Sequence, residues 1–423
     1  MEIHIVRRGE TLWQIASQYH VDIQSIIQVN QLENPNELVV GQSLVIPTSG
    51  RTHIVRYGET LWQIAHQYGT TVQAIVHANR IPAGAILYAG TPLIIPRTKT
   101  TIESNAYTYQ SPEEGAQSIK EVGDLLTYMS PFAYKVKEDA TLEPFNDDAI
   151  LDAAKSKQVT PLMSITNFTA TETGSNVAHI ILSNKNLREK TIENVLKVMD
   201  AKGYKGLNID FENVLPADRE NYNTFLQLAV DRLHPKGYFV STALAPKTSA
   251  AQGGLLYEAH DYPAHGRIAD FVILMTYEWG YRLGPPQAIS PIDEIQKVVE
   301  YALSVIPANK IFLGFQIYAR DWKIPHVAGQ EAETFSPQEA IQRAVKYGAT
   351  IYFDETAQSP YYRYADEDGQ QHEVWFEDAR SAQAKFDLIK KFNLRGVSYW
   401  ALGFPFPQNW ALLNANFTIK KTT

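Results

Sequence analysis

The stretch Gly206-Leu207-Asn208-Ile209-Asp210-Phe211-Glu212-Asn213 decides the fold of this chain. Its apolar and polar residues alternate, and successive side chains of a β-strand point to opposite faces. The polar residues Asn208, Asp210 and Glu212 therefore share one face of a predicted strand. The other face is entirely apolar, which indicates that it packs against helices.

Seven other β-rich runs lie between residue 103 and the end of the chain. They are predicted at residues 106–109, 125–132, 160–165, 239–245, 271–275, 311–317 and 396–400. Segments with apolar residues at helical spacing, such as 192–199 and 222–233, separate them. Eight strands with helices between them favour an α/β fold of the (β/α)8 TIM barrel type over an open doubly wound sheet. The polar face of 206–213 then points into the barrel and rises toward the end where active sites of this fold lie.

Two carboxylates on that face are the candidate catalytic groups. Asp210 and Glu212 stand about 6–7 Å apart along the strand, and their side chains can converge. Like charges this close discourage double ionisation, so the pair is predicted to share a proton near neutral pH and to provide a general acid. The competing interpretation is an ion-paired acidic cluster at a strand end, which is disfavoured because burying such charges is costly.

The N-terminal part of the chain is a duplicated module. Residues 4–19 and 53–68 are identical at an offset of 49 except at two positions. Each copy predicts a βααβ unit, with Thr11 as the N-cap of the first helix. We therefore divide the chain into modules at 1–48 and 52–97 and a barrel domain at 103–423. The barrel domain is expected to carry a small β-rich insertion at about 320–377, and the short stretch 97–103 predicts limited separation between modules and barrel.

Both modules resemble the lysin-motif (LysM) family in their opening strand, their Gly-Glu-Thr-Leu-Trp turn and their closing strand before proline. The resemblance implies binding of glycans that contain N-acetylglucosamine, in peptidoglycan or chitin. Trp13 and Trp62 fall on or beside the apolar helical face, so we expect them in the module cores. Sugar contacts are expected in the loops after the first strand and before the last strand. Tandem weak modules gain avidity on a polymer.

Composition excludes several classes of function. The chain has 423 residues, with 38 Lys and Arg against 46 Asp and Glu, and contains no cysteine. The net charge of −8 and the lack of a basic run argue against nucleic-acid binding. A disulfide scaffold, a thiolate zinc site and a cysteine nucleophile are excluded. Neither a membrane span nor a secretory signal is visible. We expect no metal and no cofactor, a monomer, and His260 and His265 in a solvated loop.

The strand at 206–213 is similar to the signature DxxDxDxE of family 18 glycoside hydrolases, and here it reads Lys205 to Glu212. Its last Asp and its Glu are present, whereas Lys205 and Asn208 replace the two earlier aspartates. By resemblance, Glu212 protonates the glycosidic oxygen. Asp210 orients the 2-acetamido group of the sugar, whose oxygen attacks the anomeric carbon in a substrate-assisted reaction that retains configuration.

Further segments carry the same resemblance. Met275-Thr276-Tyr277-Glu278 is similar to the family's MxYD motif, with Tyr277 as donor to the acetamido oxygen and Glu278 in place of Asp. Trp400 corresponds to the aromatic floor beneath the sugar, where an indole stacks on a pyranose. The remaining candidates for substrate binding are Ser164, Asn167, Asn208, Met275, Gln316 and Tyr318, of which the last two rest on position alone and are equally compatible with ordinary barrel-rim residues.

The modules and the barrel point to one class of substrate, because both are directed at polymers of N-acetylglucosamine. The combination resembles spore cortex-lytic enzymes of the SleL type. That resemblance implies an N-acetylglucosaminidase that acts on cortex peptidoglycan or its fragments during germination, made in the mother cell without a signal peptide and laid down in the spore. A chitinase or endo-β-N-acetylglucosaminidase is the alternative enzyme, and an inactive glycan-binding protein is the alternative class. Retention of Asp210 and Glu212 argues against inactivity.

Overall fold

The computed structural model describes residues 1–48, 50–82, 85–96, 99–169 and 172–422. The expected boundaries at residues 97 and 423 lie outside them. In the described part, eight parallel strands form a closed barrel, in which the last strand pairs with the first, Gly396 opposite Glu103. The strands are β5 (Thr100–Thr108), β6 (Tyr128–Pro131), β8 (Thr160–Thr166), β9 (Gly206–Asp210), β10 (Phe239–Leu244), β11 (Phe271–Leu274), β12 (Ile311–Gln316) and β18 (Gly396–Trp400). The predicted TIM barrel is confirmed.

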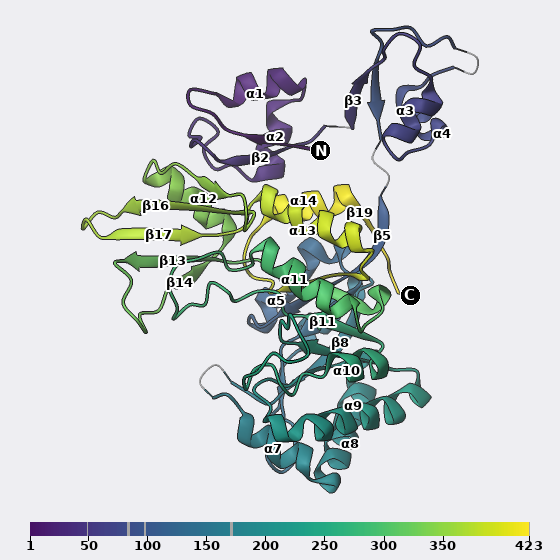
Figure 1. Cartoon of the computed structure of the whole chain (residues 1–423), viewed down its shortest axis with the longest axis vertical. Coiled ribbons are helices and arrows are strands. Elements are labelled where there is room, and N and C mark those ends of the chain that lie inside the picture. The colour runs from purple at the N-terminus through teal and green to yellow at the C-terminus, as the bar shows by residue number, and fades with distance from the viewer. Residues whose placement is uncertain (49, 83–84, 97–98, 170–171, 423) are drawn as a thin grey trace.

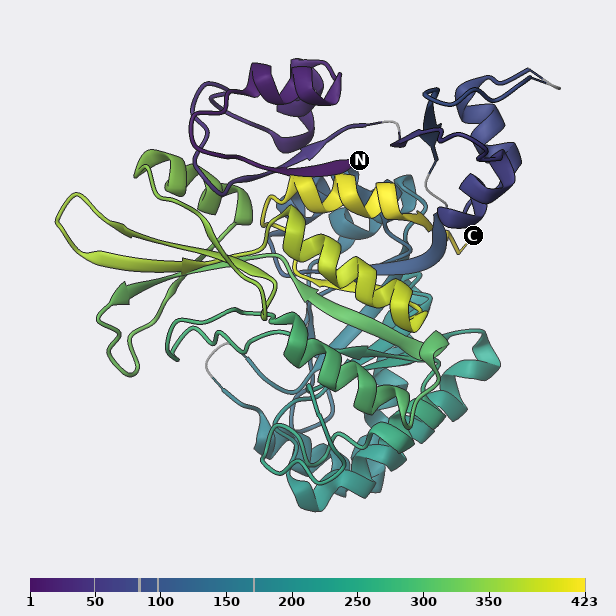
Figure 2. The same ribbon diagram turned by 45° about the horizontal axis from the view of Figure 1, so that its top comes forward.

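Helices cover the outside of the barrel (Figure 1, Figure 2). They are α5 (Pro112–Val122), α6 (Asp148–Ser156), α7 (Ser175–Ser183), α8 (Lys185–Lys202), α9 (Arg219–Leu233), α10 (Tyr262–Ile268), α11 (Ile292–Leu303), α13 (Ala379–Phe392) and α14 (Pro407–Asn416). Two short strands, β7 (Tyr134–Lys135) and β19 (Phe417–Ile419), extend the sheet. The apolar residues Leu207 and Ile209 of β9 are fully buried, and Phe211, directly after the strand, stacks on Phe225 of α9 at 5.6 Å between ring centroids. The alternation in the sequence is therefore realised as predicted.

A β-rich insertion follows the seventh barrel strand. It contains β13 (Ala319–Ile324), β14 (Glu333–Phe335), β15 (Tyr352–Asp354), β16 (Ser359–Ala365), β17 (Gln371–Trp375) and the helix α12 (Pro337–Lys346). The strands form an antiparallel sheet in the order β14-β13-β17-β16-β15, which projects to one side of the barrel (Figure 1). The β-rich pattern of residues 320–377 predicts the strands but not α12. That helix supplies Ile341 to a core shared with Phe335, Ile351 and Tyr362.

Each N-terminal module is a βααβ unit, as the repeat predicts. The first contains β1 (Glu2–Ile5), α1 (Leu12–Tyr19), α2 (Ile23–Asn30) and β2 (Ser43–Ile46). The second contains β3 (Arg51–Ile54), α3 (Leu61–Gln67), α4 (Val72–Asn79) and β4 (Pro92–Ile95). Thr11 caps α1 and forms a capping box with Gln14, and Thr60 and Gln63 repeat that arrangement in α3.

The expectation that Trp13 and Trp62 belong to the module cores is wrong. Each tryptophan is 66% exposed. The buried stripe of α1 consists of Leu12, Ile15 and Ala16, and a residue directly after Leu12 lies about 100° around the helix, outside this narrow stripe. The indole rings are therefore available on the surface of both modules.

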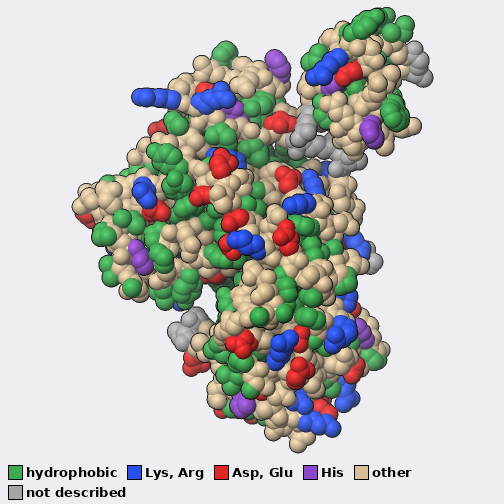
Figure 3. All heavy atoms as spheres, viewed as in Figure 1, with side chains coloured by type: hydrophobic (Ala, Val, Ile, Leu, Met, Phe, Trp, Pro, Cys, Tyr) green, Lys and Arg blue, Asp and Glu red, His purple; other side chains and the backbone are tan. Residues whose placement is uncertain are grey.

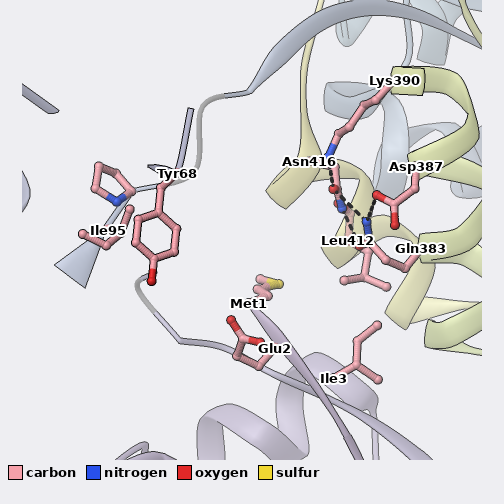
Figure 4. A pocket seen from close by; sticks show the side chains of 11 residues that line it. Met1, Glu2, Ile3, Tyr68, Ile95, Gln383, Asp387, Lys390, Leu412 and Asn416 are labelled. Carbon is pink, nitrogen blue, oxygen red and sulfur yellow. Dashed lines mark hydrogen bonds between the residues drawn. The ribbon is translucent and has the colours of Figure 1, made fainter. Parts of the chain in front are cut away.

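The two modules meet the barrel differently. Module 1 (residues 1–48) lies against α12, α13 and α14, whereas module 2 (residues 52–96) stands outward beside β5 (Figure 1, Figure 2). A pocket of about 420 Å³ lies between them and the barrel. Figure 4 shows Tyr68 and Ile95 of module 2 on one side of it and a hydrogen-bonded group of α13 and α14 side chains on the other.

The visible surface is mixed in charge, because basic and acidic side chains are interspersed over the face shown in Figure 3. None of the helices in the described ranges is long and apolar enough to cross a membrane.

A buried ion pair joins the insertion to α13. Lys385 Nζ lies 2.8 Å from Glu377 Oε2, and both side chains are at most 1% exposed. Gln316 Nε2 donates to the other oxygen of Glu377 at 2.8 Å. Removing one member of such a pair leaves an uncompensated charge in the interior, which is expensive.

We predict that Lys385→Met lowers the free energy of unfolding by about 3–5 kcal/mol, because Glu377 is left buried without its cation. Urea unfolding measures the change. Lys346→Met is the control, since Lys346 and its partner Glu367 are both exposed and their pair contributes little. Equal effects of the two substitutions would contradict the prediction.

Candidate active site

Asp210 and Glu212 lie at the carboxyl end of β9, where the barrel opens. Asp210 is 5% exposed, and its Oδ1 has no hydrogen-bond partner among the described residues. Burial, and then the charge of Glu212, raise the pKa of Asp210 well above its ordinary value. Burial, and then the charge of Glu278, raise the pKa of Glu212 to about 7. A carboxyl group that holds its proton near neutral pH can act as a general acid.

Polar groups fill the barrel beneath these carboxyls. Tyr107 donates to Asn208 Oδ1 at 2.8 Å, and Asn208 Nδ2 donates to Ser241 Oγ at 3.0 Å. Ser164 stands beside Asn208 in the neighbouring strand and is fully buried, with no partner for its hydroxyl among the described residues. Asn208 is thus occupied by protein groups and supports the layer that carries Asp210.

The backbone of Glu212 is held from two sides. Asn167 Oδ1 accepts from Glu212 N at 2.9 Å, and Asn167 Nδ2 donates to Glu212 O at 2.8 Å. His260 Nδ1 accepts from Ala245 N at 2.7 Å, so its Nε2 carries the proton and faces Phe211 O at 3.0 Å. Asn167 therefore acts on the position of Glu212.

The expectation that His260 and His265 lie in a solvated loop is wrong. Both are at most 1% exposed, and His265 belongs to α10. Burial lowers the pKa of His260 to about 4 and that of His265 to about 3. An imidazole can be buried when it is neutral. Here the ring of His260 bridges the ends of the neighbouring strands β9 and β10, through Phe211 O and Ala245 N.

Tyr277 and Glu278 follow β11 and border the same space. Burial, the neighbouring Tyr107 and the charge of Asp210 raise the pKa of Tyr277 well above its ordinary value, so its hydroxyl remains a donor. Glu278 receives two hydrogen bonds from Arg320, at 2.8 and 3.0 Å, and a third from the hydroxyl of Tyr318. Arg320 lies in β13 of the insertion, which thereby reaches the barrel mouth.

Aromatic side chains cover another part of the mouth. Trp400, at the end of β18, is half-buried and contacts Phe132 edge-on at 4.8 Å and Tyr109 in a stacked arrangement at 5.7 Å. Gln316 pairs with Trp400 in the neighbouring strand and is fully buried. Met275 is half-buried directly after β11. The predicted site residues thus lie in or directly after β8, β9, β11, β12 and β18, at or below one end of the barrel.

Three residues of this site were not predicted from the sequence. Tyr107 occupies an inward position of β5, and the alternation of that strand could have revealed it. Arg320 and His260 reach the site from an insertion and from a loop before α10, and no local pattern marks them. The described residues contain no group of three or more His, Cys, Asp or Glu side chains that could hold a metal ion.

Comparison with known proteins places the barrel in a family. The family model for glycosyl hydrolases family 18 matches residues 107–404. The chain belongs to this family. The LysM domain model matches residues 4–47 and 53–96, so the family 18 barrel carries two LysM modules at its N-terminal side.

Several relatives match this chain over its whole length. It is 51% identical to the cortical fragment-lytic enzyme of Bacillus subtilis strain 168 over 100% of both chains. It is 46% identical to the protein of the same name from Bacillus anthracis, over 100% of this chain and 99% of that one. The crystal structure of the spore cortex-lytic enzyme SleL of Bacillus megaterium QM B1551 matches with a TM-score of 0.91 and 41% identity, over 100% and 99% of the two chains.

We predict that Asn167→Ala lowers kcat about 10- to 100-fold with little change in KM, because the backbone of Glu212 loses its two side-chain hydrogen bonds. Steady-state kinetics on soluble glycan fragments measures both constants. Asn176→Ala, at an exposed position of α7, is the control. An unchanged kcat in Asn167→Ala would show that the loop holds Glu212 without it.

We predict that Glu278→Gln moves the alkaline limb of the pH profile of kcat/KM to lower pH. Burial and, after it, the negative charge of Glu278 raise the pKa of Glu212 to about 7, and activity is lost as pH rises through the pKa of the general acid. Removing the charge lowers that pKa. Glu121→Gln, at an exposed position of α5, leaves the limb in place. An alkaline limb that stays in place or moves to higher pH in Glu278→Gln would refute the assignment of Glu212 as the general acid.

Proposed function

We propose that the protein is an N-acetylglucosaminidase that hydrolyses spore cortex peptidoglycan or its fragments during germination. The observation that carries this proposal is the pair of carboxyls with raised pKa, the buried Asp210 and the half-buried Glu212, at the mouth of a family 18 barrel, in a chain that aligns over its whole length with cortical fragment-lytic enzymes. The LysM modules support binding of the same glycan. A role in the spore is supported by the names of these relatives.

The proposed reaction begins with Glu212 protonated. Its proton passes to the glycosidic oxygen, while the carbonyl oxygen of the 2-acetamido group attacks the anomeric carbon. The glycosidic bond breaks, the leaving sugar departs with the proton, and an oxazolinium ion forms. Asp210 and Tyr277 orient the acetamido group, for which the polar face of β9 and the half-buried Tyr277 hydroxyl are suited.

Water then opens the oxazolinium ion. The Glu212 carboxylate takes a proton from the water, the oxygen of the water bonds to the anomeric carbon, and the acetamido group is restored. Two inversions at one carbon give net retention of configuration. The half-buried indole of Trp400 offers an apolar platform for the sugar in both steps.

The decisive experiment is digestion of purified cortex fragments with the wild type and Glu212→Gln. We expect the substitution to reduce turnover by at least about 10²-fold, because the glutamine cannot donate the proton to the leaving oxygen. Mass spectrometry of reduced products identifies the new reducing ends, which are expected on N-acetylglucosamine.

Each other result contradicts a part of the proposal. New reducing ends on muramic acid would make the protein a muramidase. Faster release from chitin oligomers than from cortex fragments would favour the alternative of a chitinase or endo-β-N-acetylglucosaminidase. A wild type without turnover on either substrate would favour a glycan-binding protein.

A further inference from the structure

Module 1 is joined to the barrel domain by a continuous seam of hydrogen bonds. Gln408 of α14 donates to Asn30 Oδ1 at 2.9 Å and to Ser43 O at 2.8 Å. Ile351 N donates to Val40 O at 2.9 Å, next to the insertion sheet. Further bonds along the seam are Gln338 to Gln31 O, Gln342 to Glu33, Arg380 to Gly41 O and Ala379 N to Ser43 Oγ.

Apolar side chains of module 1 complete cores of the barrel domain. Val39 belongs to the core of the insertion, together with Ile351 and Tyr362. Val45 is fully buried in the main core of the barrel and its helices. The backbone at Gly41 approaches Ile351 so closely that a Cβ would lie 1.8 Å from the carbonyl oxygen of Ile351. Residues from both bodies thus share cores, as within a single domain.

Module 2 provides an internal comparison, because it repeats the same fold at an offset of 49. Tyr88 stands where module 1 has Val39 and is 67% exposed. Gly90 stands where module 1 has Gly41, with the same left-handed backbone, and a Cβ there would meet no atom within 4 Å. The seam of module 1 is filled by side chains. In contrast, a pocket of about 420 Å³ separates module 2 from α13 and α14 (Figure 4).

Module 1 also carries an open groove of its own, which is lined by its own residues. A hollow of about 280 Å³ is lined by Trp13 of α1, by α2 and by Pro35, Asn36 and Leu38. Leu38 directly precedes Val39, which is inserted in the core of the insertion. The insertion in turn carries Arg320, which holds Glu278 at the barrel mouth. Groove and mouth are therefore linked through one packed body.

We propose that module 1 is a fixed extension of the substrate-binding surface of the barrel, and that module 2 alone serves as a movable tether. This rests on the proposed function for the identity of the ligand, a glycan strand long enough to occupy both the groove of module 1 and the barrel mouth. A second site at fixed distance raises the effective concentration of such a strand at the mouth. Short fragments reach one site only and gain nothing.

The first test measures docking without any substrate. The chain has no cysteine, so pairs of introduced cysteines can be spin-labelled selectively. Gln18→Cys and Gln67→Cys are exposed, matched positions of modules 1 and 2, and each is combined with Lys391→Cys on α13. We expect a narrow distance distribution for Gln18→Cys and a broad one for Gln67→Cys. A broad distribution for module 1, or equal widths for both modules, would overturn the proposal.

The second test uses the matched glycines. Gly41→Ala and Gly90→Ala impose the same strain at φ of +85° and +88°, but only Gly41→Ala forces a Cβ against Ile351. We expect Gly41→Ala to broaden the module 1 distribution and Gly90→Ala to leave it unchanged. Gln408→Leu, which removes two seam hydrogen bonds without straining module 1, is the second variant and is expected to act in the same direction.

The third test compares kcat/KM on long cortex glycan strands with kcat/KM on the smallest soluble fragments. We expect Gly41→Ala to lower the ratio of the two about tenfold and Gly90→Ala to leave it unchanged. A ratio that stays constant in Gly41→Ala after module 1 has been loosened would overturn the fixed-extension proposal. A wild type without turnover would overturn the proposed function instead, and the spin-label result would still decide docking.

Discussion

The carboxyl group of Asp210 lies inside the barrel, and within the described residues no ion pair compensates it. A buried carboxylate without a cation is costly, so burial raises the pKa of Asp210, and burial together with the charge of Glu278 raises the pKa of Glu212. Arg320, which reaches the barrel mouth from the insertion, is bound to Glu278. The barrel supplies the burial, and the insertion supplies the arginine. The raised pKa of Glu212, which permits acid chemistry near neutral pH, depends on burial in the barrel and on the neighbouring Glu278 that the arginine binds.

Local periodicity was enough to predict the barrel. Strand alternation in 206–213 and helical spacing in 192–199 and 222–233 are consequences of burial on one face, and burial on one face is visible in a sequence. The repeat likewise predicted both βααβ modules. Contacts between segments distant in the chain were not visible. Arg320 reaches Glu278 across 42 positions, and His260 reaches Phe211 across 49.

Errors of interpretation came from residues at the border of a pattern. Trp13 follows the buried Leu12 and is predicted in the core because it falls on or beside the apolar face, although its angular position on α1 faces outward. His260 and His265 are predicted to be solvated because their segment is expected to be a loop, although a neutral imidazole can be buried when strand ends or aromatic rings accommodate it. The two modules show the same limit of prediction from sequence. Their first halves are nearly identical, yet module 1 is docked on the barrel domain and module 2 stands outward.

The barrel closes between its first strand, β5, and its last, β18, and module 1 rests on α13 and α14, which flank β18 in sequence. During synthesis the N-terminal module is therefore complete long before its docking surface exists. Its hydrogen-bonding groups and Val45 remain in contact with water until the last quarter of the chain has been synthesised. Two partners at opposite ends of the polypeptide thus make the final folding step one of high contact order.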